Sequence, residues 1–205
     1  TLNISTFSFF DEYFDRELGQ LGEGHERKND LITGMREQAK IISPLILPKL
    51  KEHFGGYEVF SVEEKLFVKI NDFLLDKYDF KGYIDLVIKT SDGKYHIIDW
   101  KSCSWGWDAK KRSNKLITYQ LTLYKKFFCQ KHKVDPAMVE THFALLKRTA
   151  KKENVEIFRV TSGPKKTNNA KDLLVQALAN IKNKNYVKNR LSCQGCEFYK
   201  TEHCP

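Results

Sequence analysis

Two strand-like segments joined by a tight turn constrain this chain more than any other feature. They are GYIDLVIK at residues 82–89 and KYHIIDWK at residues 94–101. Residues 91–93, Ser-Asp-Gly, suit a three-residue hairpin loop closed by a glycine in the left-handed region, where the missing Cβ avoids a steric cost. Pairing around this loop puts Asp85 opposite Asp99. The sequence therefore predicts an antiparallel hairpin on which two carboxylates face each other.

The alternation of side chains along a strand divides the predicted hairpin into two faces. Tyr83, Asp85, Asp99 and Lys101 share one face, and Ile84, Leu86, Ile88, Ile98 and Trp100 share the other. We expect the apolar face to be core and the polar face to carry chemistry.

The facing carboxylates indicate a metal site. Like charges directly across a strand pair destabilise it, and a divalent cation between them removes the conflict. Mg²⁺ and Mn²⁺ prefer such oxygen ligands and keep positions for water and phosphate. Lys101 would orient or deprotonate a water there, or neutralise charge that develops on a phosphate. A surface ion pair is the commoner reading of a single Asp-x-Lys triplet. The agreement of spacing, turn and alternation favours the metal site.

Hydrophobic spacing and turn residues outline the other elements. Helices are predicted at residues 8–19, 31–53, 116–132 and 164–186, and strands at 57–70, 138–147 and 154–160, with a polar connection at 23–30. Pro44 and Pro48 predict a break in the second helix, because proline lacks the backbone donor. We expect a single domain over residues 1–205, with an N-terminal helical segment (about 1–30) and a C-terminal helix plus cysteine-rich tail (about 164–205).

Three motifs in this order resemble a known family. GYIDLVIK, then IIDWKS, then YQLTLY at residues 119–124 are similar to motifs of the PD-(D/E)XK nuclease superfamily. The closest resemblance is to its RecB-like branch, which includes nuclease domains of bacterial recombination enzymes, CRISPR-adaptation nucleases and phage exonucleases. The similarity covers roughly residues 34–148. It implies an α/β fold: a restriction-endonuclease-like core with a central mixed sheet flanked by helices.

The resemblance also implies roles for particular residues. Asp85 and Asp99 would bind Mg²⁺ or Mn²⁺, and the main-chain carbonyl of Trp100 would complete the metal shell. Lys101 matches the catalytic lysine of the family. Gln120 and Tyr124 on the following helix would lie beside the active site and the DNA.

One position departs from the family pattern. Family members usually carry a histidine that reaches the metal, four residues after a glycine in the first helix of the catalytic unit. Here the helix reads GMREQA, and Gln38 occupies that position. An amide oxygen can still ligate Mg²⁺ or hold one of its waters. Glu37 or Glu64 could supply the missing negative charge, although each is more often an ordinary surface carboxylate.

Charge is distributed unevenly along the 205 residues. Residues 1–100 hold 13 basic and 18 acidic side chains, a net charge of −5, whereas residues 101–190 hold 21 and 6, a net charge of +15. This asymmetry indicates a polyanionic partner such as DNA. Basic groups that could contact DNA are Lys110, Lys111, Arg112 and Lys115, with a second cluster at Lys147, Arg148, Lys151 and Lys152. For either cluster alone, a solvated basic surface is an equally good interpretation.

Trp105 and Trp107 have two interpretations. They could stack on bases of a single strand or frayed end. They could also form a hydrophobic lid on the core, which we favour slightly. No apolar stretch approaches the roughly 20 residues needed to span a bilayer. We therefore expect a protein of the cytoplasm, in a bacterium or a phage-infected host cell, with no membrane partner.

The five cysteines raise a second site question. Cys193, Cys196 and Cys204 form a C-x₂-C-x₇-C pattern, with His203 beside the last. An odd cysteine count argues against a disulfide framework. Several RecB-like nucleases bind a 4Fe-4S cluster through three such cysteines and one further upstream, yet no cysteine precedes Cys103 here. The alternatives are a cluster with an unusual ligand, a Zn²⁺ that uses His203, or no metal.

These features predict a metal-dependent deoxyribonuclease, an exonuclease or end-processing enzyme of phage or bacterial recombination or replication. Two alternatives stay open. A catalytically degenerate module that binds DNA ends or a partner helicase is favoured by Gln38. A restriction-type endonuclease is the other, although no separate recognition domain is visible. Single- or double-stranded DNA ends are the expected partner, and a helicase, a recombination protein or further copies of the chain could join them.

Overall fold

A five-stranded mixed sheet forms the centre of the protein. The computed structural model describes all residues except 1–5, 22–28, 71–76, 186–189, 203 and 205. The strands are β1 (Tyr57–Lys69), β2 (Asp79–Thr90), β3 (Tyr95–Cys103), β4 (Val139–Lys147) and β5 (Val155–Val160). They lie in sequence order; β3 and β4 are parallel, and the other neighbours are antiparallel. The predicted α/β fold with a central mixed sheet is confirmed.

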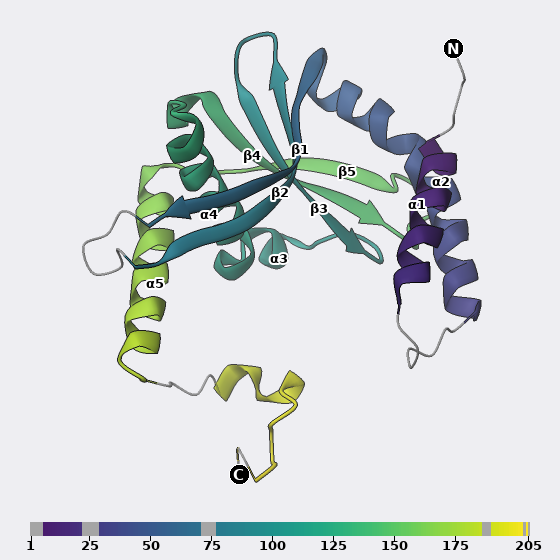
Figure 1. The fold of residues 1–205 in the computed structure, drawn as a ribbon. Coiled ribbons are helices and arrows are strands. Elements are labelled where there is room, and N and C mark those ends of the chain that lie inside the picture. The colour runs from purple at the N-terminus through teal and green to yellow at the C-terminus, as the bar shows by residue number, and fades with distance from the viewer. Residues whose placement is uncertain (1–5, 22–28, 71–76, 186–189, 203, 205) are drawn as a thin grey trace.

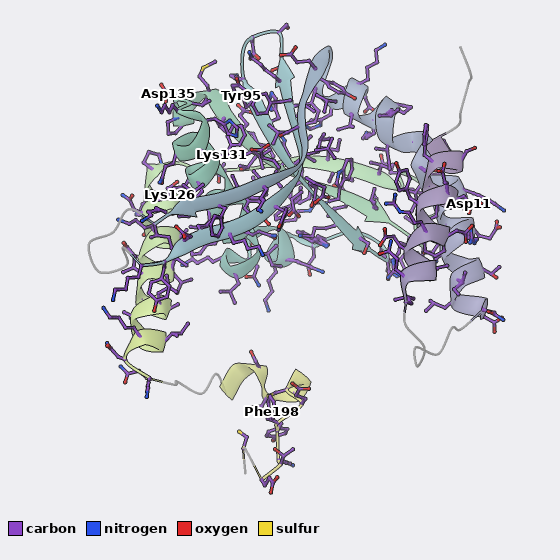
Figure 2. The ribbon with its side chains drawn as sticks, in the orientation of Figure 1. Asp11, Tyr95, Lys126, Lys131, Asp135 and Phe198 are labelled. Atoms are coloured by element: carbon purple, nitrogen blue, oxygen red, sulfur yellow. The ribbon has the colours of Figure 1, made fainter. Side chains whose placement is uncertain are left out.

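Helices flank this sheet (Figure 1). They are α1 (Thr6–Gln20), α2 (Asn29–Phe54), α3 (Ala109–Ser113), α4 (Lys115–His132) and α5 (Pro164–Lys182), with short 3₁₀ turns η1 (Pro136–Met138) and η2 (Arg190–Gly195). α3 and α4 make the crossover that the parallel β3–β4 pair requires. Figure 2 marks Asp11 on α1 and, on the opposite side of the molecule, Lys126 and Lys131 on α4.

Both faces of the sheet are packed. On the α4 side, Val87, Ile97 and Phe143 join α4 residues Leu121 and Phe127 in one buried cluster. On the α2 side, Leu86, Ile88, Ile98 and Ala144 pack against Leu50 of α2. The expectation of one core face and one chemical face was therefore wrong. Asp99 of β3 lies within an otherwise apolar surface, which removes its carboxylate from water.

α2 contains Pro44 and Pro48 without a break, so the predicted interruption was wrong. Each proline leaves one carbonyl of the preceding turn without its helical donor. Nearby, the buried Ser43 hydroxyl donates to the Ala39 carbonyl at 2.8 Å. Leu50 of the same helix is buried against the sheet. Burial of this kind stabilises a helix enough to offset proline, which local propensity alone does not indicate.

The hairpin turn has the predicted form. Gly93 has a φ of +82°, and the Thr90 N–H donates to the Lys94 carbonyl at 3.0 Å. The Thr90 hydroxyl donates to Asp92 at 2.5 Å. This hydrogen bond, together with the Lys94 N–H, lowers the pKa of Asp92 to about 2.

The chain after the sheet departs from the prediction in one respect. α5 ends at Lys182, and the predicted end at Tyr186 lies outside the described residues. η2 and the segment that carries Phe198 lie apart from the sheet (Figures 1 and 2). In the described part of the chain, no helix has the length and apolar character to cross a membrane.

Candidate active site at a fork between two strands

The strands β2 and β3 part at the level of the predicted carboxylate pair. Their regular pairing runs from the turn as far as Leu86 and Ile98. One step further, the Asp85 carboxylate accepts the Trp100 N–H at 2.7 Å. A regular ladder would offer the Trp100 N–H a main-chain carbonyl of β2 instead. The Asp85 side chain therefore replaces a strand partner, which holds its carboxylate beside β3.

The alternation of β2 reverses at the same point. Leu86 packs on the α2 side, yet Ile84 belongs to the α4-side cluster, and Gly82 faces Tyr124 of α4. Residues two apart on a regular strand share a face, so β2 is irregular at Asp85. Ile84 therefore does not share a face with Leu86, and Tyr83 falls on the α2 side, contrary to the sequence expectation.

The neighbouring strand is distorted at this level too. Glu63 of β1 has a φ of +49°, between Val62, which pairs with Leu86, and Glu64, which pairs with Ile84. A positive φ costs free energy for a residue with a Cβ, and such outliers cluster at functional sites. Two adjacent strands thus leave regular geometry where Asp85 lies.

Asp99 lies deep in the fork and is paired with Lys101. Its exposed fraction is 2%, and Lys101 Nζ lies 2.6 Å from Asp99 Oδ2. Burial raises the pKa of Asp99, the Lys101 ammonium opposes this, and the negative charge of Asp85 raises the pKa further. The two carboxylates are therefore close enough to repel each other. A desolvated carboxylate beside a second one is a donor set that fits a hard divalent cation.

Gln120 and Tyr124 meet on α4. The Gln120 amide donates to the Tyr124 hydroxyl at 3.1 Å, four residues along the helix. A Cβ on Gly82 would lie 2.8 Å from Tyr124 Cε1, so the tyrosine ring is seated where β2 has no side chain. This contact connects the pair to the strand of Asp85, three residues away. Sequence analysis missed the role of Gly82, although a glycine inside a strand is a recognised signal of close approach.

The weaker metal candidates have other surroundings. Glu37 is exposed and pairs with Lys40 at 2.6 Å. Glu64 contacts Lys131 and His132 of α4, each at 2.7 Å. Although burial opposes it, hydrogen bonds from these partners lower the pKa of Glu64. Gln38 is half-buried on α2. Both carboxylates are thus occupied by cationic partners.

Some of the predicted DNA-binding basic side chains contact Glu156, whereas others are exposed. Arg112 donates to Glu156 at 2.6 Å and to the Trp107 carbonyl at 2.8 Å, so it fastens α3 to β5. Lys147 is buried and lies 3.5 Å from the same Glu156. Lys110 and Lys115 are exposed. Sequence analysis did not find this Arg112–Glu156 contact, since it joins residues 44 positions apart.

The two tryptophans differ in environment. Trp107 is 8% exposed and its ring packs against Phe143, with 5.1 Å between ring centres, as expected of a hydrophobic lid. Lys111 Nζ lies 4.9 Å from the centre of the Trp107 ring. Trp105 is 70% exposed, so the lid interpretation was wrong for this residue.

The C-terminal cysteines are unpaired, and their segment is held by local turns. Cys193 and Cys204 are half-buried and Cys196 is exposed. Within the described residues, these thiols do not form a group with metal-ligand spacing. His203 lies outside the described residues. A cluster or a zinc ion at this tail stays a prediction.

Comparisons with known proteins identify the family of the chain. The family model of the PD-(D/E)XK nuclease superfamily matches residues 4–201, so the chain belongs to this superfamily. A solved structure of a candidate exonuclease from Eubacterium rectale has a TM-score of 0.54 and 16% identity, covering 94% of this chain and 71% of that one. The structure of SSO0001 has a TM-score of 0.45 and 15% identity, covering 92% and 90%. At this identity the likeness concerns the fold alone. No curated protein matched the chain.

Substitution of Gly82 tests the seating of Tyr124. We expect Gly82→Ala to displace the tyrosine ring, because 2.8 Å is shorter than any normal carbon–carbon contact. Thermal denaturation should report a loss of about 1–3 kcal/mol, typical of overpacking, and the rate of DNA cleavage should fall. The control is Gly34→Ala on α2, where a Cβ meets nothing within 4 Å and stability should hold or rise. Equal effects of the two substitutions would contradict the role of Gly82.

Proposed function

We propose that this protein is a metal-dependent deoxyribonuclease of the RecB-like branch, which processes DNA ends as an exonuclease. The observation that carries the proposal is the fork of β2 and β3, where Asp85, the buried Asp99 and the Lys101 ammonium converge. A role in phage or bacterial recombination or replication follows from the branch. Membership of the superfamily supports nuclease chemistry.

The residues of the fork would have different roles in cleavage. Asp85, Asp99 and the main-chain carbonyl of Trp100 would hold Mg²⁺ or Mn²⁺, which supplies a Lewis acid for the phosphate and lowers the pKa of an attacking water. Lys101 has 30% of its side chain exposed, so its ammonium can reach a substrate phosphate while Asp99 orients it. It would neutralise charge that develops on the phosphate as the bond breaks. Gln120 and Tyr124 would position the DNA strand beside this centre.

Basic and aromatic groups that follow β3 in the chain support DNA as the substrate. Residues 101–190 carry a net charge of +15. Lys110, Lys111 and Lys115 begin the crossover that leads from β3 into α4, and the exposed Trp105 precedes them. Phosphate contacts by lysine give salt-dependent affinity without sequence preference, as an end-processing enzyme requires. Arg112 is engaged with Glu156, and we therefore assign it to the support of α3.

Labelled DNA tests the proposed activity. Purified protein is incubated with end-labelled linear DNA and with closed circular DNA, in Mn²⁺ or in EDTA. We expect loss of label from the linear DNA only, and only with the metal. Internal cuts at fixed sites would indicate a restriction-type endonuclease. Binding without cleavage in Mn²⁺ would indicate a degenerate module and overturn the proposal.

Trp105 provides a separate test of DNA contact. We expect Trp105→Ala to weaken binding of single-stranded DNA by roughly 1–3 kcal/mol, the usual cost of losing one stacked base. Stability should stay within about 0.5 kcal/mol, because the ring is 70% exposed. Leu116→Ala, at a side chain that is 75% exposed, is the control and should leave binding unchanged. Fluorescence anisotropy of labelled DNA gives both affinities, and equal affinities for the two variants would exclude stacking by Trp105.

A further inference from the structure

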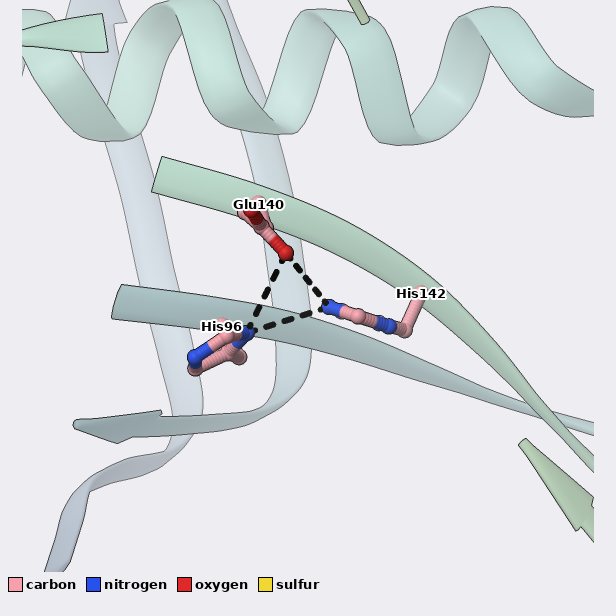
Figure 3. A group of neighbouring side chains, drawn as sticks. All are labelled: His96, Glu140 and His142. Carbon is pink, nitrogen blue, oxygen red and sulfur yellow. Dashed lines mark hydrogen bonds and ion pairs between the residues drawn. The ribbon is translucent and has the colours of Figure 1, made fainter. Parts of the chain in front are cut away.

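A second cluster of ligand-type side chains lies on the α2 side of the sheet, opposite Asp99. His96 on β3 and Glu140 and His142 on β4 come together there (Figure 3). His96 alternates with Ile97, which faces α4, and its ring packs on Phe54 of α2 with 4.9 Å between ring centres. The cluster is therefore separate from the Asp85–Asp99 fork.

The distances between the ligand atoms of this cluster fit a cation with tetrahedral coordination. His96 Nδ1 lies 3.1 Å from His142 Nε2, and each of these nitrogens lies 3.9 Å from Glu140 Oε2. Zinc–ligand distances of about 2.0–2.1 Å at tetrahedral angles separate two ligand atoms by about 3.3–3.4 Å. Shifts of a few tenths of an ångström would let all three atoms contact one ion. Two imidazoles and a carboxylate suit Zn²⁺ and similar cations better than Mg²⁺, which prefers oxygen.

A chain of hydrogen bonds fixes the orientation of His96. The single Thr90 hydroxyl proton is directed to Asp92, at 2.5 Å, so Thr90 Oγ1 accepts from His96 Nε2 at 3.1 Å. His96 Nδ1 is then left with its lone pair directed at His142 and Glu140. Metal-binding histidines are commonly oriented in this way, by a hydrogen bond at the other ring nitrogen.

The two imidazoles are held neutral. His96 is 7% exposed and His142 is 2% exposed. Burial is the main cause that lowers the pKa of both rings, and it lowers that of His142 to about 3. His142 Nδ1 is buried and has no hydrogen-bond partner within the described residues.

Two cations compete for the carboxylate. Arg159 Nε lies 3.4 Å from Glu140 Oε2, and Lys94 Nζ lies 3.8 Å from Oε1. The side chains of Arg159 and Lys94 are 61% and 40% exposed, so both can turn toward solvent at little cost. Neither therefore closes the site to a divalent ion.

We propose that His96, Glu140 and His142 form a binding site for Zn²⁺ or a similar divalent transition-metal cation. The site joins β3 to β4 three residues before Asp99, and three protein ligands leave a fourth position open. Its bound cation would tie the parallel pair together beneath the end of α2. The site does not depend on the proposed nuclease activity.

Zinc titration by calorimetry tests the proposal. All proteins carry Cys193→Ser, Cys196→Ser and Cys204→Ser in the full chain, so that the tail thiols bind no zinc, and excess Mg²⁺ occupies the carboxylate fork. We expect one equivalent of Zn²⁺ and a rise in melting temperature. Glu140→Gln should weaken binding at least tenfold, and Thr90→Val should weaken it roughly 10- to 100-fold through lost orientation of His96.

A matched control removes another histidine that contacts a glutamate. His132→Gln breaks the 2.7 Å contact with Glu64 and should leave zinc affinity unchanged. Arg159→Ala should tighten binding, because it removes the competing cation. Absence of zinc binding in the parent protein would overturn the proposal, and so would equal affinities of the parent and the Glu140→Gln variant. Circular dichroism confirms that each variant is folded.

Discussion

Asp99→Asn should abolish DNA cleavage and yet stabilise the metal-free protein. The carboxylate is 2% exposed and repelled by Asp85, so its charge costs free energy in the folded state. An amide of the same shape carries no such cost. Cleavage should fall roughly 10³-fold or more, because several kcal/mol of metal-assisted stabilisation are lost at 1.36 kcal/mol per factor of ten.

The gain in stability should depend on pH. Since the folded pKa of Asp99 lies above its ordinary value of 3.8, the folded protein loses this proton at a higher pH than the unfolded chain. Ionised Asp99 therefore destabilises the parent protein fully at pH values above its pKa in the folded state. This destabilisation disappears as the pH falls below the pKa of Asp99 in the unfolded chain. In EDTA, the melting temperature of Asp99→Asn should exceed that of the parent protein at neutral pH, and the two melting temperatures should become equal in acid.

Asp85→Asn is the companion variant. The amide oxygen can still accept the Trp100 N–H, whereas alanine would leave that donor unpaired at a cost of roughly 1–3 kcal/mol. We expect a folded protein that binds DNA and does not cleave it in Mn²⁺. Full cleavage by either asparagine variant, measured on labelled linear DNA, would remove the metal mechanism.

Lys101→Met should also slow cleavage, but with the opposite effect on stability. The ammonium is the cation that contacts Asp99 Oδ2, at 2.6 Å, and methionine keeps most of the stem without the charge. A buried carboxylate without its partner costs roughly 1–3 kcal/mol. The loss of charge neutralisation or proton transfer should slow cleavage about 10²- to 10⁴-fold. Single-turnover rates at saturating protein measure this effect apart from DNA affinity.

The double variant Asp99→Asn/Lys101→Met separates the two effects. In EDTA it should be more stable than Lys101→Met, because the orphaned charge is gone, and the two changes should not add. If the changes in the free energy of unfolding caused by the two single substitutions add up to that of the double variant, Lys101 and Asp99 do not interact in the folded protein. The 2.6 Å contact would then have no energetic meaning.

Local sequence signals predicted most of the elements. The turn at Gly93 followed from a glycine where positive φ is needed, and the strand and helix positions followed from hydrophobic spacing. Departures arose where distant segments meet. α2 continues through Pro44 because the sheet buries its apolar residues, and Trp105 is exposed although its neighbour Trp107 is buried.

In the candidate site, too, local features were predicted and contacts between distant segments were not. The order of Asp85, Asp99 and Lys101 along two segments predicted their convergence, since strand alternation and turn length are local properties. The reversal at Asp85 and the seating of Tyr124 on Gly82 depend on contacts between elements. Three further residues were not anticipated as a group: His96, Glu140 and His142, which become neighbours only through the parallel pairing of β3 with β4.

The sequence by itself therefore determined which residues the hairpin carries and the turn that joins its strands, because turn type and the pairing next to the turn are local properties. Only the tertiary structure decided how far each group is removed from water. The depth of Asp99 and the neutral state of His142 arise from burial by segments distant in the chain, and the Arg112–Glu156 ion pair arises from contact between two such segments. Burial sets the free energy of a charge, and no local pattern encodes it.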